Sequence, residues 1–184
     1  MNKSDFDAFV ERQQAKEREE APFDPKRQLA EWLGYLDALY KQITEFLDAY
    51  IKRDSAHIQY SEVHLNEDFS GPYTAPGMLL KIGRSTITFT PIGTMLIGSK
   101  GRVDVQGPLG TARLGLVNKK VTSARQLIQV TVTLPGQPRP APSPPEHASN
   151  IEWAWKIITP PPEIKFIDLT QEAFFDMILS VADA

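Results

Sequence analysis

The clearest pattern along the chain is helical and begins at Asp24-Pro25. Apolar side chains recur at spacings of three and four as far as residue 53, which marks one broad apolar face. Asp24 suits the cap of such a helix, and Pro25 suits its first position because the missing N–H costs nothing there. The spacing therefore predicts a helix over 25–53 whose apolar face packs on a sheet.

Alternation with a period of two predicts antiparallel strands between residues 78 and 117. Ile87 and Phe89 alternate with threonines, as expected for a strand with one buried face. The segments 83–84 and 107–110 suit tight turns, because glycine accepts positive φ and proline presets φ at a turn position. Residues 78–117 are therefore predicted to form a β-meander.

Further strands are predicted on both sides of this meander. Residues 56–69 have the composition of a strand, but their apolar parity changes midway, which a β-bulge near Ser61 would reconcile. Residues 70–77 are predicted to be a loop. Alternating apolar residues predict strands at 126–134 and 151–158, which we expect to pair with each other.

The C-terminal part adds an edge strand and a helix. Residues 163–169 are predicted to form the short edge strand, and Thr170 caps a last helix that starts at Gln171. The fold class is therefore predicted as α+β, with an antiparallel sheet or partly closed barrel of six or seven strands packed by both helices. The predicted core comprises Trp32, Leu36, Ile43, Phe46, Ile87, Phe89, Leu114, Val130, Val132, Trp153 and Trp155.

Composition limits the class of protein. A chain of 184 residues with 41% hydrophobic and 23% charged residues resembles an ordinary globular domain. We expect a charged helical arm at 1–22 and a single domain at 23–184. The absence of cysteine excludes disulfides and thiolate metal sites, and no apolar run is long enough to span a membrane. A cytoplasmic protein without a membrane segment or cofactor is expected.

Charge is unevenly distributed along the chain. Residues 1–77 carry a net charge of −6, residues 78–134 carry +7, and residues 135–184 carry −4. Such segregation is typical of a recognition surface for an acidic partner or for a polyanion. The candidate binding residues are Arg84, Lys100, Arg102, Arg113, Lys119, Lys120 and Arg125.

A proline-rich stretch at 135–150 contains six prolines and cannot be a central strand or a helix. It is predicted to be an exposed, semi-rigid loop. Arg139, Pro142 and Pro145 match the R-x-x-P-x-x-P spacing that readers of polyproline helices bind. A plain spacer between strands is the alternative interpretation.

Two histidines offer a weak metal-binding pattern. The predicted bulge would place His57 and His64 on one polar face with Glu62. Imidazole and carboxylate are suitable donors for zinc, so a metal-dependent hydrolase is one alternative, although the spacing matches no known motif. Surface histidines on an edge strand are the competing interpretation.

Known catalytic signatures are missing from the sequence. It contains no nucleophile elbow, phosphate loop, dinucleotide fingerprint or H-E-x-x-H. We therefore predict a non-catalytic intracellular binding or accessory protein, an adaptor or inhibitor of a protein partner. The alternatives are binding of nucleic acid or another polyanion through the basic region 78–134, and the metal-dependent hydrolase.

Overall fold

The computed structural model describes residues 7, 24–68, 70–94, 99–127 and 151–182. The chain divides into two units, one formed by residues 1–24 and 129–152 and the other by residues 25–128 and 153–184. The second unit contains the sheet and both helices that pack on it. The predicted N-terminal arm and the proline-rich loop lie almost entirely outside the described residues.

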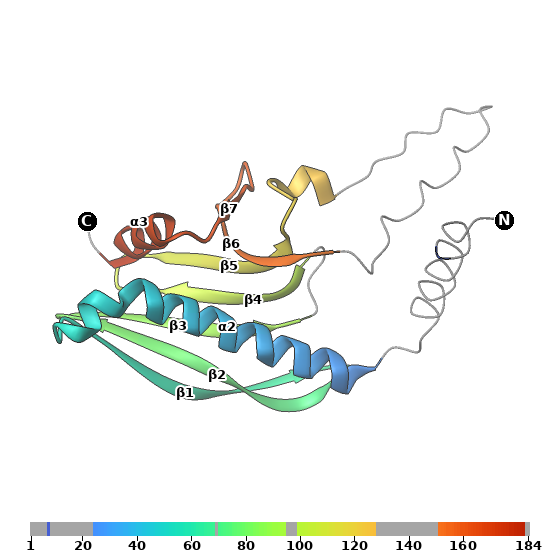
Figure 1. Ribbon diagram of the computed structural model, residues 1–184, viewed down its shortest axis with the longest axis horizontal. Coiled ribbons are helices and arrows are strands. Elements are labelled where there is room, and N and C mark those ends of the chain that lie inside the picture. The colour runs from blue at the N-terminus through green and yellow to red at the C-terminus, as the bar shows by residue number, and fades with distance from the viewer. Residues whose placement is uncertain (1–6, 8–23, 69, 95–98, 128–150, 183–184) are drawn as a thin grey trace. The chain divides into compact units, whose positions relative to one another are not determined.

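The sheet is open and antiparallel, and its seven strands follow one another in space in the order of the sequence (Figure 1). This confirms the predicted α+β class and the predicted number of strands. The strands are β1 (Ala56–Glu67), β2 (Gly71–Ile82), β3 (Ser85–Gly93), β4 (Ser99–Gln106), β5 (Thr111–Asn118), β6 (Trp153–Ile158) and β7 (Phe166–Asp168), and a 3-10 helix, η1 (Ala124–Leu127), follows β5.

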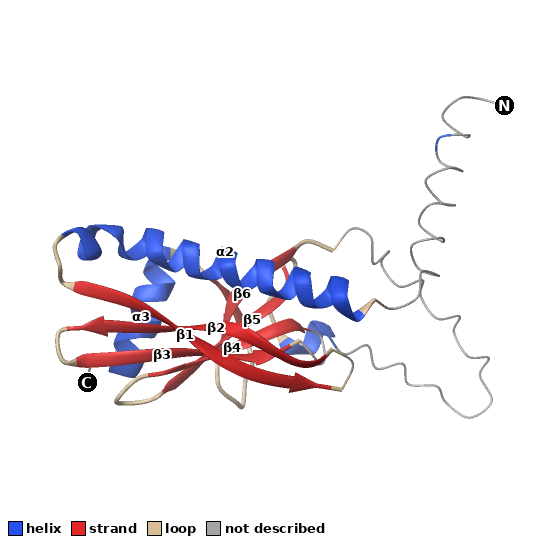
Figure 2. Cartoon of the chain, turned by 90° about the horizontal axis from the view of Figure 1, so that it is seen from below, coloured by secondary structure: helices blue, strands red, loops and turns tan. Residues whose placement is uncertain are grey.

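Two helices pack on one face of the sheet. Helix α2 (Pro25–Lys52) runs lengthwise over the strands (Figure 2), close to its predicted bounds. Helix α3 (Gln171–Ala182) begins at the predicted cap, where the Thr170 hydroxyl accepts a hydrogen bond from the Ala173 amide at 3.2 Å. The Phe46 and Phe174 rings, 5.7 Å apart, join the two helices. In the described part of the chain, no helix is long and apolar enough to cross a membrane.

The predicted core is largely confirmed. Seven of its residues are buried, namely Trp32, Leu36, Ile43, Ile87, Phe89, Leu114 and Trp155. Phe46 and Trp153 are partly buried against this cluster, whereas Val130 and Val132 lie outside the described residues. The helical and alternating patterns thus identified the residues that face one another across the helix–sheet interface.

The predicted loop at 70–77 is wrong, because residues 71–77 form the first half of β2 and only Ser70 lies in a turn. Residues 71–77 pair with β1 alone, since β3 pairs only with Met78–Ile82. Pro72 and Pro76 have the same parity, so both can direct their missing N–H toward the side of β2 that has no neighbour. Proline in this half of β2 therefore removes no hydrogen bond between strands.

The predicted bulge near Ser61 is also wrong, since β1 pairs with β2 in continuous register from Ala56 to Glu67. Burial nevertheless changes parity at this point, with Ile58 half-buried before it and Leu65 after it. The change occurs where the β1–β2 ribbon separates from β3. Beyond this point the β1–β2 ribbon has no third strand beside it, and its twist turns the opposite face toward the core. The twist therefore explains the parity change without a bulge.

The predicted pairing between 126–134 and 151–158 is contradicted as well. Strand β6 pairs with β5 on one side and with β7 on the other, so both of its edges are occupied. Residues 126 and 127 belong to η1, and residues 128–134 lie outside the described part of the chain. Proximity in sequence suggested 126–134 as the partner of β6, but the partner on that side is β5, the last strand of the predicted meander.

Helix α2 packs tightly on β4 at Gly101, and this contact can be tested. A Cβ atom at Gly101 would overlap the Trp32 ring, so Gly101→Ala should lower the free energy of unfolding by about 1–3 kcal/mol. Gly34 in α2 is a matched control, because a Cβ there meets nothing within 4 Å. Gly34→Ala should raise stability by about 0.5–1 kcal/mol. Urea unfolding measures both changes, and equal effects would contradict the packing.

Candidate binding groove

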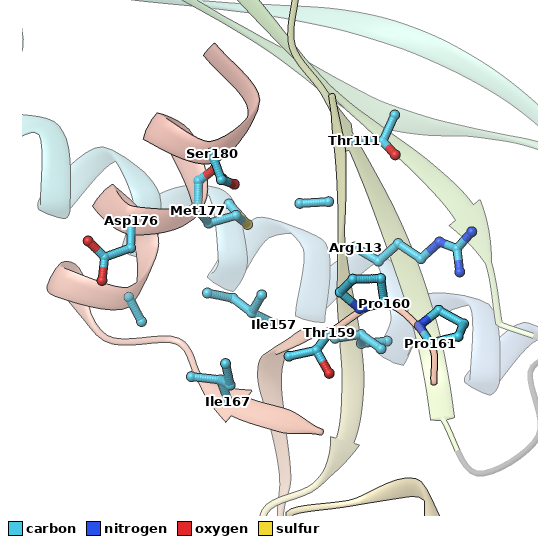
Figure 3. Close-up of a pocket in the computed structure, with 13 residues that line it drawn as sticks. Thr111, Arg113, Ile157, Thr159, Pro160, Pro161, Ile167, Asp176, Met177 and Ser180 are labelled. Atoms are coloured by element: carbon cyan, nitrogen blue, oxygen red, sulfur yellow. The ribbon is translucent and has the colours of Figure 1, made fainter. Parts of the chain in front are cut away.

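A groove of about 560 Å³ lies between α3 and the ends of strands β5, β6 and β7 (Figure 3). Its apolar part is formed by Ile157, Ile167 and Met177. Arg113 on β5 and Asp176 on α3 lie on opposite sides of it in Figure 3. A volume of this size, with an apolar lining and a few polar groups, is typical of a ligand or peptide site.

The groove exists because β6 ends two residues short of the first residue of the antiparallel strand β5. Ile158 is the last residue of β6 and pairs with Arg113, so Thr111 and Ala112 of β5 have no partner on that side. The chain continues as Thr159-Pro160-Pro161, and proline cannot extend the ladder because it lacks an N–H. The exposed end of β5 and helix α3 therefore form two walls without a strand between them.

The charged groups of the groove are available for a ligand. Among the described residues, neither the Arg113 guanidinium nor the Asp176 carboxylate has a hydrogen-bond or ion-pair partner, and both side chains are exposed. The Ser180 hydroxyl, also in the lining, donates to the Met177 carbonyl at 2.6 Å. The groove can therefore hold an apolar group and offer a cation and an anion beside it.

Lys156, a residue that the sequence did not single out, holds one wall of the groove. Its side chain is 1% exposed, and its ammonium donates to the carbonyls of Lys119 and Val121 at 2.8 and 3.0 Å. It also forms an ion pair with Asp168 of β7 at 2.9 Å. The two carbonyl contacts hold the segment after β5 against β6, and the ion pair adds to the ladder that joins β7 to β6. Strand β7 in turn places Ile167 in the groove.

Two of the predicted cationic residues are neutralised within the fold. Lys100 forms an ion pair with Glu31 of α2 at 3.0 Å and lies 5.2 Å from the centre of the Trp153 ring. The hydrogen bond from Lys100 lowers the pKa of Glu31 below its ordinary value. Arg102 forms an ion pair with Asp104 at 2.9 Å. Neither cation is free to contact a phosphate without breaking a contact in the protein.

The remaining predicted cations do not form one patch. Arg84 lies in the turn between β2 and β3, at the same end of the sheet as the start of β5. Lys119 and Lys120 follow the end of β5, at the opposite end of the sheet. Arg125 belongs to η1. Only Arg113 belongs to the groove.

The predicted metal residues on β1 are kept apart. Because β1 contains no bulge, His57 and His64 differ in parity and project from opposite faces of the ribbon. His57 lies 3.7 Å from Asp54, whereas His64 lies 3.1 Å from the Thr74 hydroxyl and shares its face with Glu62. Within the described ranges, no group of three His, Cys, Asp or Glu side chains could hold a metal ion. The predicted proline-loop residues Arg139, Pro142 and Pro145 lie outside those ranges.

A polar cluster near the start of α2 was also missed by sequence reasoning. The Thr94 hydroxyl donates to Glu67 at 2.9 Å and accepts from Gln28 at 3.2 Å. Tyr73 lies beside them, and its pKa is raised above the ordinary value, first by burial and then by the Glu67 carboxylate. The Tyr73 hydroxyl and the Trp32 indole N–H have no hydrogen-bond partner among the described residues. Bridging water is the usual solution for such groups.

The Lys156 contacts lead to a stability prediction. Lys156→Met keeps a long unbranched side chain but leaves two carbonyls and Asp168 without their donor. The free energy of unfolding should therefore fall by about 1–3 kcal/mol. Lys165→Met removes an exposed ion pair with Glu163 and should change stability by less than about 0.5 kcal/mol. Urea unfolding compares the two. Similar effects would show that the buried contacts of Lys156 contribute no more to stability than an exposed ion pair.

Comparison of the chain with known protein families, with curated proteins and with solved structures gave no match. The topology by itself does not indicate a function, because unrelated activities occur on the same architecture. What the protein does must therefore be inferred from its own side chains.

Proposed function

We propose that this chain is a non-catalytic cytoplasmic binding protein, an adaptor or inhibitor that holds a segment of a protein partner. The observation that supports this proposal is the groove between α3 and β5–β7. Its apolar lining lies beside a guanidinium and a carboxylate that have no partners among the described residues. Groups arranged in this way suit recognition of an amphipathic segment.

The chemistry of the groove defines the segment. An apolar side chain of the partner enters between Ile157 and Met177, while an acidic group beside it faces Arg113 and a basic group faces Asp176. Burying one large apolar side chain contributes about 1.5–3 kcal/mol, whereas an exposed ion pair contributes about 0.2–1 kcal/mol. The apolar contact therefore supplies most of the affinity, and the charges supply orientation.

The polyanion alternative has less support from the geometry. A phosphate backbone is held by several unpaired cations that lie along one surface. Here Lys100 and Arg102 are occupied by Glu31 and Asp104, and the turn lysines lie at the far end of the sheet from Arg84. This arrangement favours a protein partner over nucleic acid.

The groove can be tested by affinity capture from the cytoplasm of the source cells, followed by mass spectrometry. A stoichiometric partner retained by the full chain should be lost when Ala173→Phe fills the groove, and its affinity should fall about threefold when Arg113→Glu reverses one charge. Ala49→Phe, on the exposed face of α2, and Arg84→Glu are matched controls that should retain it.

Two results would contradict the proposal. One is equal capture of every partner by the groove variants and by their controls. The other is the recovery of no stoichiometric partner together with turnover in a broad substrate screen.

Nucleic-acid binding is tested separately. Labelled single- and double-stranded DNA and RNA are titrated with the full chain at two salt concentrations, and we expect no saturable binding at about 50 mM salt. Binding that weakens steeply with salt, and whose salt dependence falls when Arg84, Lys100, Arg102 and Arg113 are reversed in charge, would establish the alternative instead.

A further inference from the structure

A second recognition surface lies at the other edge of the sheet, around Tyr60 of β1. Two hollows, of about 520 and 380 Å³, share Tyr60 and Pro76 as the ridge between them. Tyr60 is 59% exposed, although it is a large aromatic residue. The Tyr60 surface comprises Asp37, Lys41, Glu45, Tyr60, Glu62 and Pro76.

The ridge is held in place by contacts beneath it. The rings of Tyr40 and Tyr60 lie 5.9 Å apart with their planes inclined by 52°. The Tyr40 hydroxyl donates to the Pro76 carbonyl at 2.9 Å, which joins helix α2 to strand β2. An exposed aromatic ring that is positioned in advance costs little conformational entropy on binding, because it is already ordered.

The Tyr60 surface is also acidic. Asp37 and Glu45 lie along α2 in the first hollow with Lys41 between them, and Glu62 lines the second hollow. Among the described residues, none of the three carboxylates forms an ion pair. One lysine against three carboxylates leaves a net negative surface on both sides of the ring, which favours a cationic ligand.

We propose that the Tyr60 surface binds a proline-rich segment of a partner protein, one that carries an arginine. A polyproline helix has three residues per turn, so prolines three positions apart lie on one side and can enter two neighbouring hollows. Such segments dock in grooves lined by aromatic side chains. A carboxylate beside the groove can accept charge-assisted hydrogen bonds from the arginine. Arginine can also stack on the exposed Tyr60 ring. This site is separate from the groove at α3 and does not depend on the function proposed for it.

The sequence supplies a suitable probe. Residues 135–145 carry Arg139, Pro142 and Pro145 at the required spacing, with a net charge of +1. A labelled synthetic peptide of residues 135–145 is titrated with the full chain, and fluorescence anisotropy is recorded. The protein carries Arg139→Glu, so that its own copy of the motif does not compete with the peptide.

We expect saturable binding that weakens at least tenfold in Tyr60→Ala and several-fold in Glu62→Lys. Tyr60→Phe keeps the ring and should keep the affinity within about twofold. Tyr50→Ala and Glu163→Lys change an exposed tyrosine and an exposed carboxylate outside the surface, and should not alter binding. A peptide with Arg139→Glu should bind at least fivefold more weakly.

Three results would overturn the proposal. The first is the absence of binding at millimolar protein, and the second is unchanged affinity in both Tyr60→Ala and Glu62→Lys. The third is equal affinity for the Arg139→Glu peptide. A segment that instead added a strand to the open edge of β1 would bind through its backbone, and would therefore give the second and third results together.

Discussion

The contact between the start of α2 and strand β4 holds the two layers of the protein together. Trp32 is 1% exposed and lies over Gly101, where only a residue without a side chain leaves room for its ring. The same ring lies 5.9 Å from Trp155 of β6, and the Trp155 indole donates to the Tyr35 carbonyl at 3.0 Å. One turn of helix thereby joins two strands that are not neighbours in the sheet.

A register shift in β4 makes this contact possible. Successive residues of a regular strand face opposite sides, yet Lys100 and Gly101 both meet α2, through Glu31 and Trp32. The ladder between β4 and β5 is irregular between Ser99 and Gly101, and a bulge of this kind redirects a side chain. The ion pair and the aromatic contact therefore both depend on one local irregularity, and together they hold the start of α2 against β4.

Sequence patterns predicted what is local and failed where the outcome depended on distant pairing. The period of α2 and the alternation in β3 are determined by each segment's own buried face, so both were predicted. The parity change in β1 was recognised, but its cause was not, because the separation of the ribbon from β3 depends on where a third strand ends. The prolines of β2 suggested a loop for the same reason, since a proline is tolerated or excluded according to what lies beside it.

The binding groove was even less predictable from sequence. Arg113 was one of several candidate cations, but Asp176 is 63 positions away in the sequence. Both line one groove because β6 stops at Ile158, opposite Arg113, and leaves the start of β5 uncovered. Lys156 occupies an exposed-type position in an alternating strand, yet the segment after β5 crosses over it and supplies two carbonyls. A buried ammonium with three partners cannot be distinguished by composition from a surface lysine, because its acceptors are backbone atoms of a turn.

The order of the strands places the two surfaces at opposite edges of one sheet. The groove is formed by β5, β6 and β7, and the Tyr60 surface is formed by β1 and β2 with α2. Between these edges lies a continuous ladder from β2 to β5 with buried apolar residues. The ligands proposed for the two surfaces would therefore share no contact residue. Such separation would suit the proposed adaptor, since a protein that holds two molecules together needs two sites that do not overlap.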